Sequence, residues 1–252
     1  MDRSTAAKVL GVIAAVLLIY SANPWVVPPD ELRDVITYAF WATFIATLIL
    51  LFADRRAPGG TDVEIEGPAF ARFLFNNSRA GLFWLPVRLF LGFAWLDAGW
   101  HKFTDPDNAW MGGGVALRSY WERAAAIPEE GRPPITYEWY RDFIQVLLDN
   151  NAETWFGPLI TFGEIAVGVG LLVGALTGVA AFFGALMNMS FLLAGSASTN
   201  PVLFTLAIGL ILAWKVAGYY GLDRYLLPML GTPWRPAILS GHRTGAEPGS
   251  VS

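Results

Sequence analysis

The chain has no cysteine and only two histidines, and both shortages limit its chemistry. Without cysteine, its own residues cannot form disulfides, iron–sulfur clusters, thiolate metal sites or thiol redox pairs. His101 lies at the end of an apolar segment, whereas His242 lies in the polar C-terminal tail. The two imidazoles are therefore not expected to bind one haem together, and no metal site is predicted.

Charge is also scarce. Only 15% of the 252 residues are Asp, Glu, Lys or Arg, against about 25% in an ordinary soluble domain. Hydrophobic residues make up 54% of the chain, which is typical of an integral membrane protein. The net charge of −4 is not clustered, so no nucleic-acid partner is expected. The predicted surroundings are a lipid bilayer.

Six apolar segments are candidates for membrane-spanning helices: 6–20, 35–53, 81–101, 156–176, 178–194 and 202–220. The connections between the last three are only a few residues long, so these helices are predicted to be antiparallel neighbours. The predicted fold is therefore an all-α integral membrane protein with six transmembrane helices.

Basic residues set the predicted orientation, because short cytoplasmic connections are enriched in Lys and Arg. Arg3 and Lys8 place the N-terminus in the cytoplasm, and the connection after the second span carries Arg55, Arg56, Arg72 and Arg79. Region 104–154 then lies outside, although it also contains arginines, because long segments are translocated with little regard to charge. The protein is predicted to be multi-pass, with both termini cytoplasmic.

The outer region is predicted to form an ordered cap. Segments 115–126 and 137–148 both have the periodicity of amphipathic helices, and in the second Tyr140, Ile144 and Leu147 share one face. The same region contains tryptophans that suit the level of the lipid headgroups: Trp110, Trp121, Trp139 and Trp155. We expect the two helices to lie over the outer ends of the spans.

The third apolar segment carries ionisable side chains, which are costly inside a bilayer. At ~100° per residue, Arg88, Gly92 and Trp95 share one face of a helix. Asp97 and His101 lie on roughly the opposite face. Arg88 and Asp97 are also ~13 Å apart along the axis, at ~1.5 Å per residue. Both are therefore predicted to find partners on other helices.

In the outer half of the membrane, the expected partner is Glu164 on the fourth span. A short carboxylate several residues deep cannot reach water by extending its side chain. Glu164 is therefore predicted to meet Asp97, His101 or Lys102. The sequence leaves open whether such a contact is a structural ion pair or a proton carrier.

In the inner half, Arg88, Asp223 and Lys215 are assigned to structural ion pairs, with Arg88 and Asp223 expected within salt-bridge reach. Lys215 could instead extend to the membrane interface. Asn188, in the middle of the fifth span, is expected to form a hydrogen bond between helices. Small residues that would let the helices approach closely are Gly163, Gly168, Gly170, Gly174 and Gly184.

Three motifs resemble the DoxX/DoxD family of membrane proteins. The first is Arg88-Leu-x-Leu-Gly followed by Ala98-Gly-x-x-Lys102-Phe-x-Asp-Pro. The second is Glu164 followed by Gly168-x-Gly-Leu-Leu-x-Gly174, and the third is Gly218-x-x-Gly-Leu-Asp223. The Trp-rich segment with Tyr137-x-Trp-Tyr is similar to the DoxD type, the small subunit of thiosulfate:quinone oxidoreductase. The resemblance covers about residues 85–227.

This resemblance implies a four-helix membrane bundle associated with quinone-linked redox work in a prokaryotic cell membrane. The division expected from it is two N-terminal transmembrane helices in 1–56, a cytoplasmic connector in 57–80 and the DoxX-like bundle in 81–227. The cap occupies 104–155, and a polar cytoplasmic tail follows in 228–252.

The functional hypothesis is a subunit of a quinone-linked oxidoreductase, for example of the thiosulfate:quinone type, with an outer-leaflet quinone or proton site. The residues assigned to proton transfer are Glu164, Asp97 and His101, and those assigned to the quinone are Trp95, Trp100 and Lys102. Quinone would be a diffusible co-substrate with no covalently bound cofactor, and a partner redox subunit would supply electrons.

Two other functions stay open. The first alternative is a non-catalytic membrane scaffold that anchors redox or stress-response enzymes. A small-solute or proton transporter ranks third, because no inverted repeat is evident. Whether the chain is itself an enzyme is undecided at this point.

Overall fold

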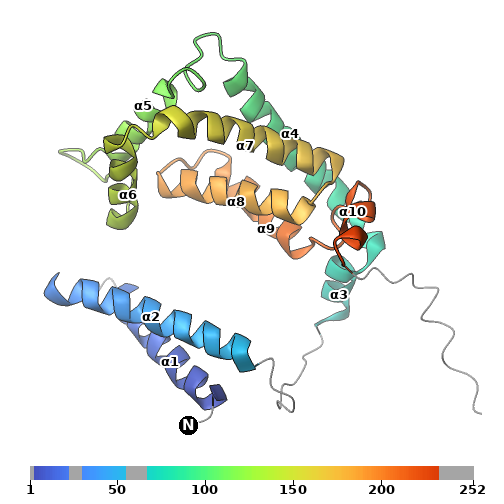
Figure 1. Cartoon of the computed structure of the whole chain (residues 1–252), viewed down its shortest axis with the longest axis horizontal. Helices are drawn as coiled ribbons and strands as arrows, with labels where there is room; N and C mark the ends of the chain where they lie inside the picture. Colours follow the sequence, from blue (N-terminus) through green and yellow to red (C-terminus); the bar gives the residue numbers. More distant parts are fainter. Residues whose placement is uncertain (1–2, 23–29, 55–66, 233–252) are drawn as a thin grey trace, which may run out of the picture. The chain divides into compact units, whose positions relative to one another are not determined.

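The computed structural model describes residues 3–22, 30–54 and 67–232, and every regular element in these ranges is helical (Figure 1). The all-α prediction is thus confirmed for the described residues. Contacts divide the chain into two units, Met1–Glu66 and Gly67–Ser252.

The first unit is a helical hairpin of α1 (Arg3–Ala22) and α2 (Asp30–Asp54). Small residues one turn apart line the face of α1 that meets α2. Ala7 and Ala14 are buried there, and a Cβ on Gly11 would lie 3.5 Å from Thr47 Cγ2. The hairpin therefore packs through small side chains and leaves most of its larger apolar side chains exposed.

The second unit contains the remaining helices. They are α3 (Ala69–Asn76), η1 (Ser78–Ala80), α4 (Gly81–Phe103), α5 (Val115–Ala125), α6 (Glu138–Asp149), α7 (Glu153–Val173), α8 (Thr177–Leu193), α9 (Asn200–Leu212) and α10 (Asp223–Met229). α4 packs along α7, α8 along α9, and α7 beside α8. In Figure 1, α5 and α6 lie at one end of α7 and α10 lies at the other. We call these the cap end and the turn end, the latter after the tight α7–α8 connection.

Glycines let α4 and α7 touch along their backbones. A Cβ on Gly92 would lie 2.9 Å from the amide nitrogen of Leu172, and a Cβ on Gly168 would lie 2.5 Å from that of Leu96. Gly184 on α8 similarly leaves room for the indole of Trp95. The predicted role of Gly168 and Gly184 in close helix approach is confirmed.

The cap helices form where the amphipathic periodicity predicted them. Tyr140, Ile144 and Leu148 of α6 are buried against Leu117 and Trp121 of α5 in a hydrophobic cluster of their own. Leu147, predicted on the buried face, packs at the edge of this cluster. The cap is therefore a second small core at the end of the bundle.

Two described helices are both long and apolar enough to cross a membrane, over Ser78–Phe103 and Glu153–Val173. α8 has 17 residues and α9 has 13, which at ~1.5 Å per residue is ~26 and ~20 Å against a hydrocarbon core of ~30 Å. The structure therefore supports membrane association through α4 and α7. Six transmembrane helices are not established by it.

The predicted span 202–220 is too long, because α9 ends at Leu212 and turns follow. Two glycines let the segment after α9 pack closely against its neighbours. A Cβ on Gly218 would overlap the carboxylate of Asp223, and one on Gly221 would lie 2.8 Å from Gly174 Cα. The chain thus returns from the cap end to the turn end through the short helix α9 and the turns that follow it.

Candidate functional site

A buried ion pair joins α4 to α7 at the cap end. Lys102 Nζ lies 2.6 Å from Glu164 Oε2. The side chain of Glu164 is 1% exposed and that of Lys102 is 17% exposed. The prediction that Glu164 meets Asp97, His101 or Lys102 is confirmed, and the partner is Lys102.

Local geometry explains why these two side chains meet. A Cβ on Gly99 would lie 2.9 Å from the amide nitrogen of Ile165 and 3.0 Å from Glu164 Cβ, so only glycine allows α7 to come this close to α4. Lys102 follows three residues later and reaches back over this contact. Its ammonium group also lies 5.0 Å from the ring centroid of Trp110, in the segment that leads to the cap. An aromatic face near a cation adds electrostatic stabilisation.

Asp97 and His101 are separate from this ion pair. They are exposed, with 53% and 75% of their side chains accessible, and they face each other one turn apart on α4. His101 Nδ1 lies 2.8 Å from the carbonyl oxygen of Asp97 and 3.3 Å from its Oδ1. Of the residues assigned to proton transfer, Glu164 on α7 is therefore buried in a pair with Lys102, whereas Asp97 and His101 on α4 form a separate, exposed pair.

The three residues assigned to the quinone do not gather in one place either. Trp95 is buried in the bundle core against Gly184. Trp100 is exposed, and its ring lies 5.9 Å from that of Phe103. Only Lys102 contacts Glu164. At ~100° and ~1.5 Å per residue, Trp100 points ~140° away from Trp95, and Lys102 shares the direction of Trp95 but lies ~10 Å further along the helix.

At the turn end, the predicted salt bridge between Arg88 and Asp223 does not form. Arg88 instead donates hydrogen bonds to the carbonyl oxygens of Leu171 at 2.8 Å and Tyr220 at 3.1 Å. Asp223 accepts from the amides of Leu176 at 2.5 Å and Thr177 at 2.9 Å. The two buried charges thus bind opposite termini of neighbouring helices: a cation at the C-terminus of α7 and an anion at the N-terminus of α8.

Lys215 is exposed, and its ammonium group lies 5.7 Å from the ring centroid of Trp214. The described residues include no carboxylate within ion-pair distance of it. The interfacial alternative fits this arrangement better than the ion-pair assignment does.

The predicted hydrogen bond from Asn188 to another helix is not formed within the described part of the chain. Its side chain is fully buried on α8, yet neither its nitrogen nor its oxygen has a hydrogen-bond partner among the described residues. The indole N–H of Trp95, beside Gly184 one turn earlier on α8, also lacks a partner. The bundle core therefore contains uncompensated polar groups, which is unusual in a native interior.

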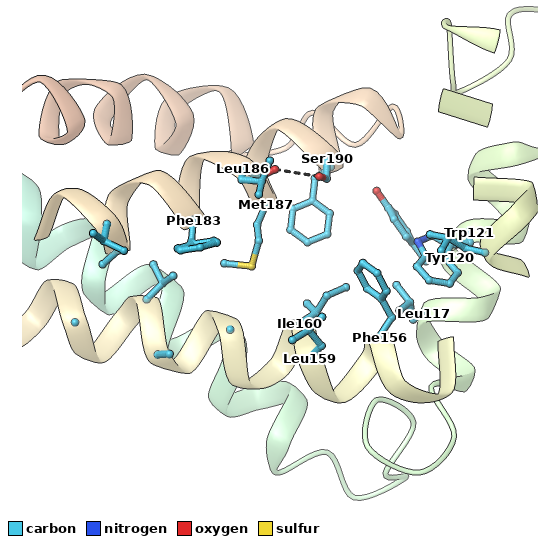
Figure 2. A pocket seen from close by; sticks show the side chains of 18 of the residues that line it. Leu117, Tyr120, Trp121, Phe156, Leu159, Ile160, Phe183, Leu186, Met187 and Ser190 are labelled. Carbon is cyan, nitrogen blue, oxygen red and sulfur yellow. Dashed lines mark hydrogen bonds between the residues drawn. The ribbon is translucent and has the colours of Figure 1, made fainter. Parts of the chain in front are cut away.

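A pocket of about 600 Å³ lies between the cap and the α7–α8 pair (Figure 2). Trp121 and Phe156 line its cap end, and Leu176 and Val179 line its far end. Burial raises the pKa of Tyr120 and Tyr140, whose phenols border the pocket near the cap. The pattern of the sequence gave no sign of this pocket, because its lining comes from four separate helices.

Side chains that could bind a metal do not converge within residues 3–22, 30–54 and 67–232, where no group of three or more His, Asp or Glu is found. Comparison of the chain with protein-family models, curated proteins and solved structures finds no match. The resemblance to DoxX/DoxD proteins therefore stays a prediction from the sequence motifs.

Proposed function

We propose that this chain is a DoxX/DoxD-like membrane subunit of a quinone-linked oxidoreductase and that the Lys102–Glu164 pair exchanges protons for that reaction. The observation that carries the proposal is a carboxylate almost fully buried between two helices of membrane length, with one lysine as its partner. Reduction of a quinone to a quinol consumes two electrons and two protons, so a membrane site needs a proton donor near the headgroup.

The topology we propose keeps all six helices in the membrane. α8 begins at the turn end of α7 and ends beside the cap, where the carbonyl oxygen of Ser190 accepts a hydrogen bond from Tyr140. α9 and the turns after it lead back to Tyr220, which accepts a hydrogen bond from Arg88. Both therefore connect the same two ends as α7 does. Both chain termini would be cytoplasmic and the cap would face outward, in a prokaryotic cell membrane.

In the proposed mechanism, Lys102 and Glu164 act as a switchable pair. When the ammonium group turns from Glu164 toward the surface, the carboxylate loses its partner in a low-dielectric site and takes up a proton. The return of Lys102 favours release of that proton. A partner redox subunit would oxidise the donor: with thiosulfate, two ions each lose one electron and join as tetrathionate, and the quinone receives both electrons.

The test is thiosulfate-dependent quinone reduction by the purified protein, with and without a co-purifying partner. We expect Glu164→Gln to reduce the rate by about 10²–10⁴-fold, the contribution typical of a general acid. Asp97→Asn is the matched control, because this carboxylate lies on α4, the helix of Lys102, but is exposed and outside the pair. Absence of turnover and of bound quinone in the wild type would contradict the proposal.

The scaffold function remains the alternative. It is favoured because the six predicted site residues do not gather in one place. The Lys102–Glu164 pair is then a single buried ion pair, which can also serve only to hold two helices together. Isolation in mild detergent separates the two functions. A stoichiometric soluble partner, together with unchanged activity of that partner when Glu164→Gln is introduced, would support the scaffold.

A further inference from the structure

We infer that the pocket between the cap and the α7–α8 pair binds a neutral lipid with a single long chain, with its headgroup beneath the cap. This inference rests on the proposed membrane location but not on the quinone reaction. The Lys102–Glu164 pair does not line the pocket, so the site is separate from the one proposed for proton exchange.

The distribution of polarity along the pocket fixes the orientation of the lipid. Its hydroxyl-bearing side chains all lie near the cap end: Tyr120, Tyr140 and Ser190. The Ser190 hydroxyl donates to the carbonyl oxygen of Leu186 at 3.0 Å (Figure 2), which leaves its own oxygen able to accept. From Ile160 to Val179, the lining side chains are apolar. One polar end and one apolar end match an amphiphile.

The charge of the lining selects the headgroup. None of the residues that line the pocket is Asp, Glu, Lys, Arg or His. A phospholipid headgroup carries a phosphate that would need a cation or several N–H donors when it leaves water. The pocket offers hydroxyl groups instead, so it complements a neutral headgroup with a hydroxyl or carbonyl oxygen. Ser196 lies near the Tyr120 hydroxyl, but the two do not form a hydrogen bond with good geometry. The Tyr120 hydroxyl is therefore available to the headgroup.

The size and shape of the pocket suit one chain. Its volume is within the usual range of ~300–1,000 Å³ for small-molecule sites. On α8 it extends from Val179 to Phe191, a distance of ~18 Å at ~1.5 Å per residue. Small residues on α7, Gly163 and Ala166, line the pocket together with Phe183 and Met187 of α8, and we call the α7 side its floor. A hydrocarbon chain would lie along this floor.

Gly163 provides a sharp test, because a Cβ there would lie 3.8 Å from Met187 Sδ, in ordinary van der Waals contact. Gly163→Ala should therefore leave the pocket open, whereas Gly163→Phe should fill it. The full chain in mild detergent is labelled with a photoactivatable long-chain fatty alcohol and, separately, with phosphatidylglycerol that carries the same photoreactive chain. Cross-linked peptides are identified by mass spectrometry.

We expect the alcohol to label peptides that line the pocket, Gly163→Ala to preserve labelling, and Gly163→Phe to reduce it by more than about tenfold. If Gly163→Phe does not fold, Ala166→Phe replaces it, because Ala166 is exposed on the same floor. Equal labelling by phosphatidylglycerol, labelling that is insensitive to the filled variants, or cross-links confined to other surfaces would overturn the inference. Quinone reduction is measured on the same samples. It tests the proposed function, whereas cross-linking tests the lipid site, so either can fail without the other.

Discussion

At the scale of single residues, the difference between buried and exposed charges decides where chemistry is plausible. Lys102 belongs to the buried pair with Glu164, whereas His101, the residue next to it on α4, belongs to the exposed pair with Asp97. Exposed ion pairs contribute little to stability, whereas a buried carboxylate depends on its partner. Adjacent residues of one helix therefore have different physical roles.

Lys102→Met should destabilise the protein more than Glu164→Gln does. Loss of Lys102 leaves the buried Glu164 carboxylate without a partner, so it must stay charged or take up a proton, and either costs about 3–5 kcal/mol. Loss of the Glu164 charge leaves an ammonium group that is 17% exposed and can turn toward water, so about 1 kcal/mol is expected. Chemical denaturation in detergent measures both free energies of unfolding.

The double variant Lys102→Met/Glu164→Gln provides the control for this comparison. It should be more stable than Lys102→Met alone, because it contains no buried charge at the pair. Equal losses for the two single variants, with additive effects in the double variant, would show that the two side chains do not stabilise each other.

At the scale of helices, periodicity predicted most of the fold. The 3.6-residue repeat placed Arg88, Gly92 and Trp95 on one face of α4, which is buried. It also placed Tyr140 and Ile144 on one face of α6, where Leu148 is buried with them in place of the predicted Leu147. Periodicity gives the direction of a side chain but not its neighbour across a helix interface. Glu164 therefore had three candidate partners in the sequence, and the position of the Gly99 contact made Lys102 the one within reach.

The predicted Arg88–Asp223 salt bridge at the turn end was wrong for a physical reason. The sequence identifies Arg88 and Asp223 as opposite charges, but backbone groups left unpaired at helix termini are equally strong partners and have no sequence signature. Each charge binds such groups around the α7–α8 connection. The same arrangement requires Gly218 and Gly221, because a Cβ at either position would collide with Asp223 or with the end of α7.

Asp223→Ala should lower stability substantially at the α7–α8 connection. The substitution removes two charge-assisted hydrogen bonds to the start of α8, each worth about 1.5–3 kcal/mol. It also removes the nearest opposite charge from buried Arg88. We expect the thermal midpoint in detergent to fall by about 6–24 °C.

Asp223→Asn is the matched variant, because it keeps the size and one acceptor oxygen but loses the charge. Its thermal midpoint should lie between those of the wild type and Asp223→Ala. A midpoint for Asp223→Ala within about 1 °C of the wild type would mean that the Asp223 carboxylate does not stabilise the start of α8.

At the scale of the whole molecule, helix length and helix connectivity give different numbers of membrane crossings. Among the helices of the described ranges, only α4 and α7 qualify by length and composition. By connectivity, α8 ends beside the cap, where Gly195 packs against the backbone of Pro134. If α8 and α9 cross with α7, their connection lies on the same side as the cap. If they do not cross, this connection faces the cytoplasm, and the contacts of Gly195 and Ser190 with the cap are not made in the membrane.

The absence of native cysteine makes the choice between these topologies directly measurable. Single cysteines at exposed positions would be labelled in intact cells with a membrane-impermeant maleimide: Glu129→Cys in the cap, Ala197→Cys in the α8–α9 connection and Met229→Cys in α10. We expect Glu129→Cys and Ala197→Cys to react from outside and Met229→Cys to react only after permeabilisation. Reaction of Ala197→Cys only after permeabilisation would reduce the membrane-spanning part of residues 67–232 to α4 and α7. The lipid pocket would then lack its bilayer surroundings on α8, so this labelling pattern decides the membrane environment on which both proposed sites depend.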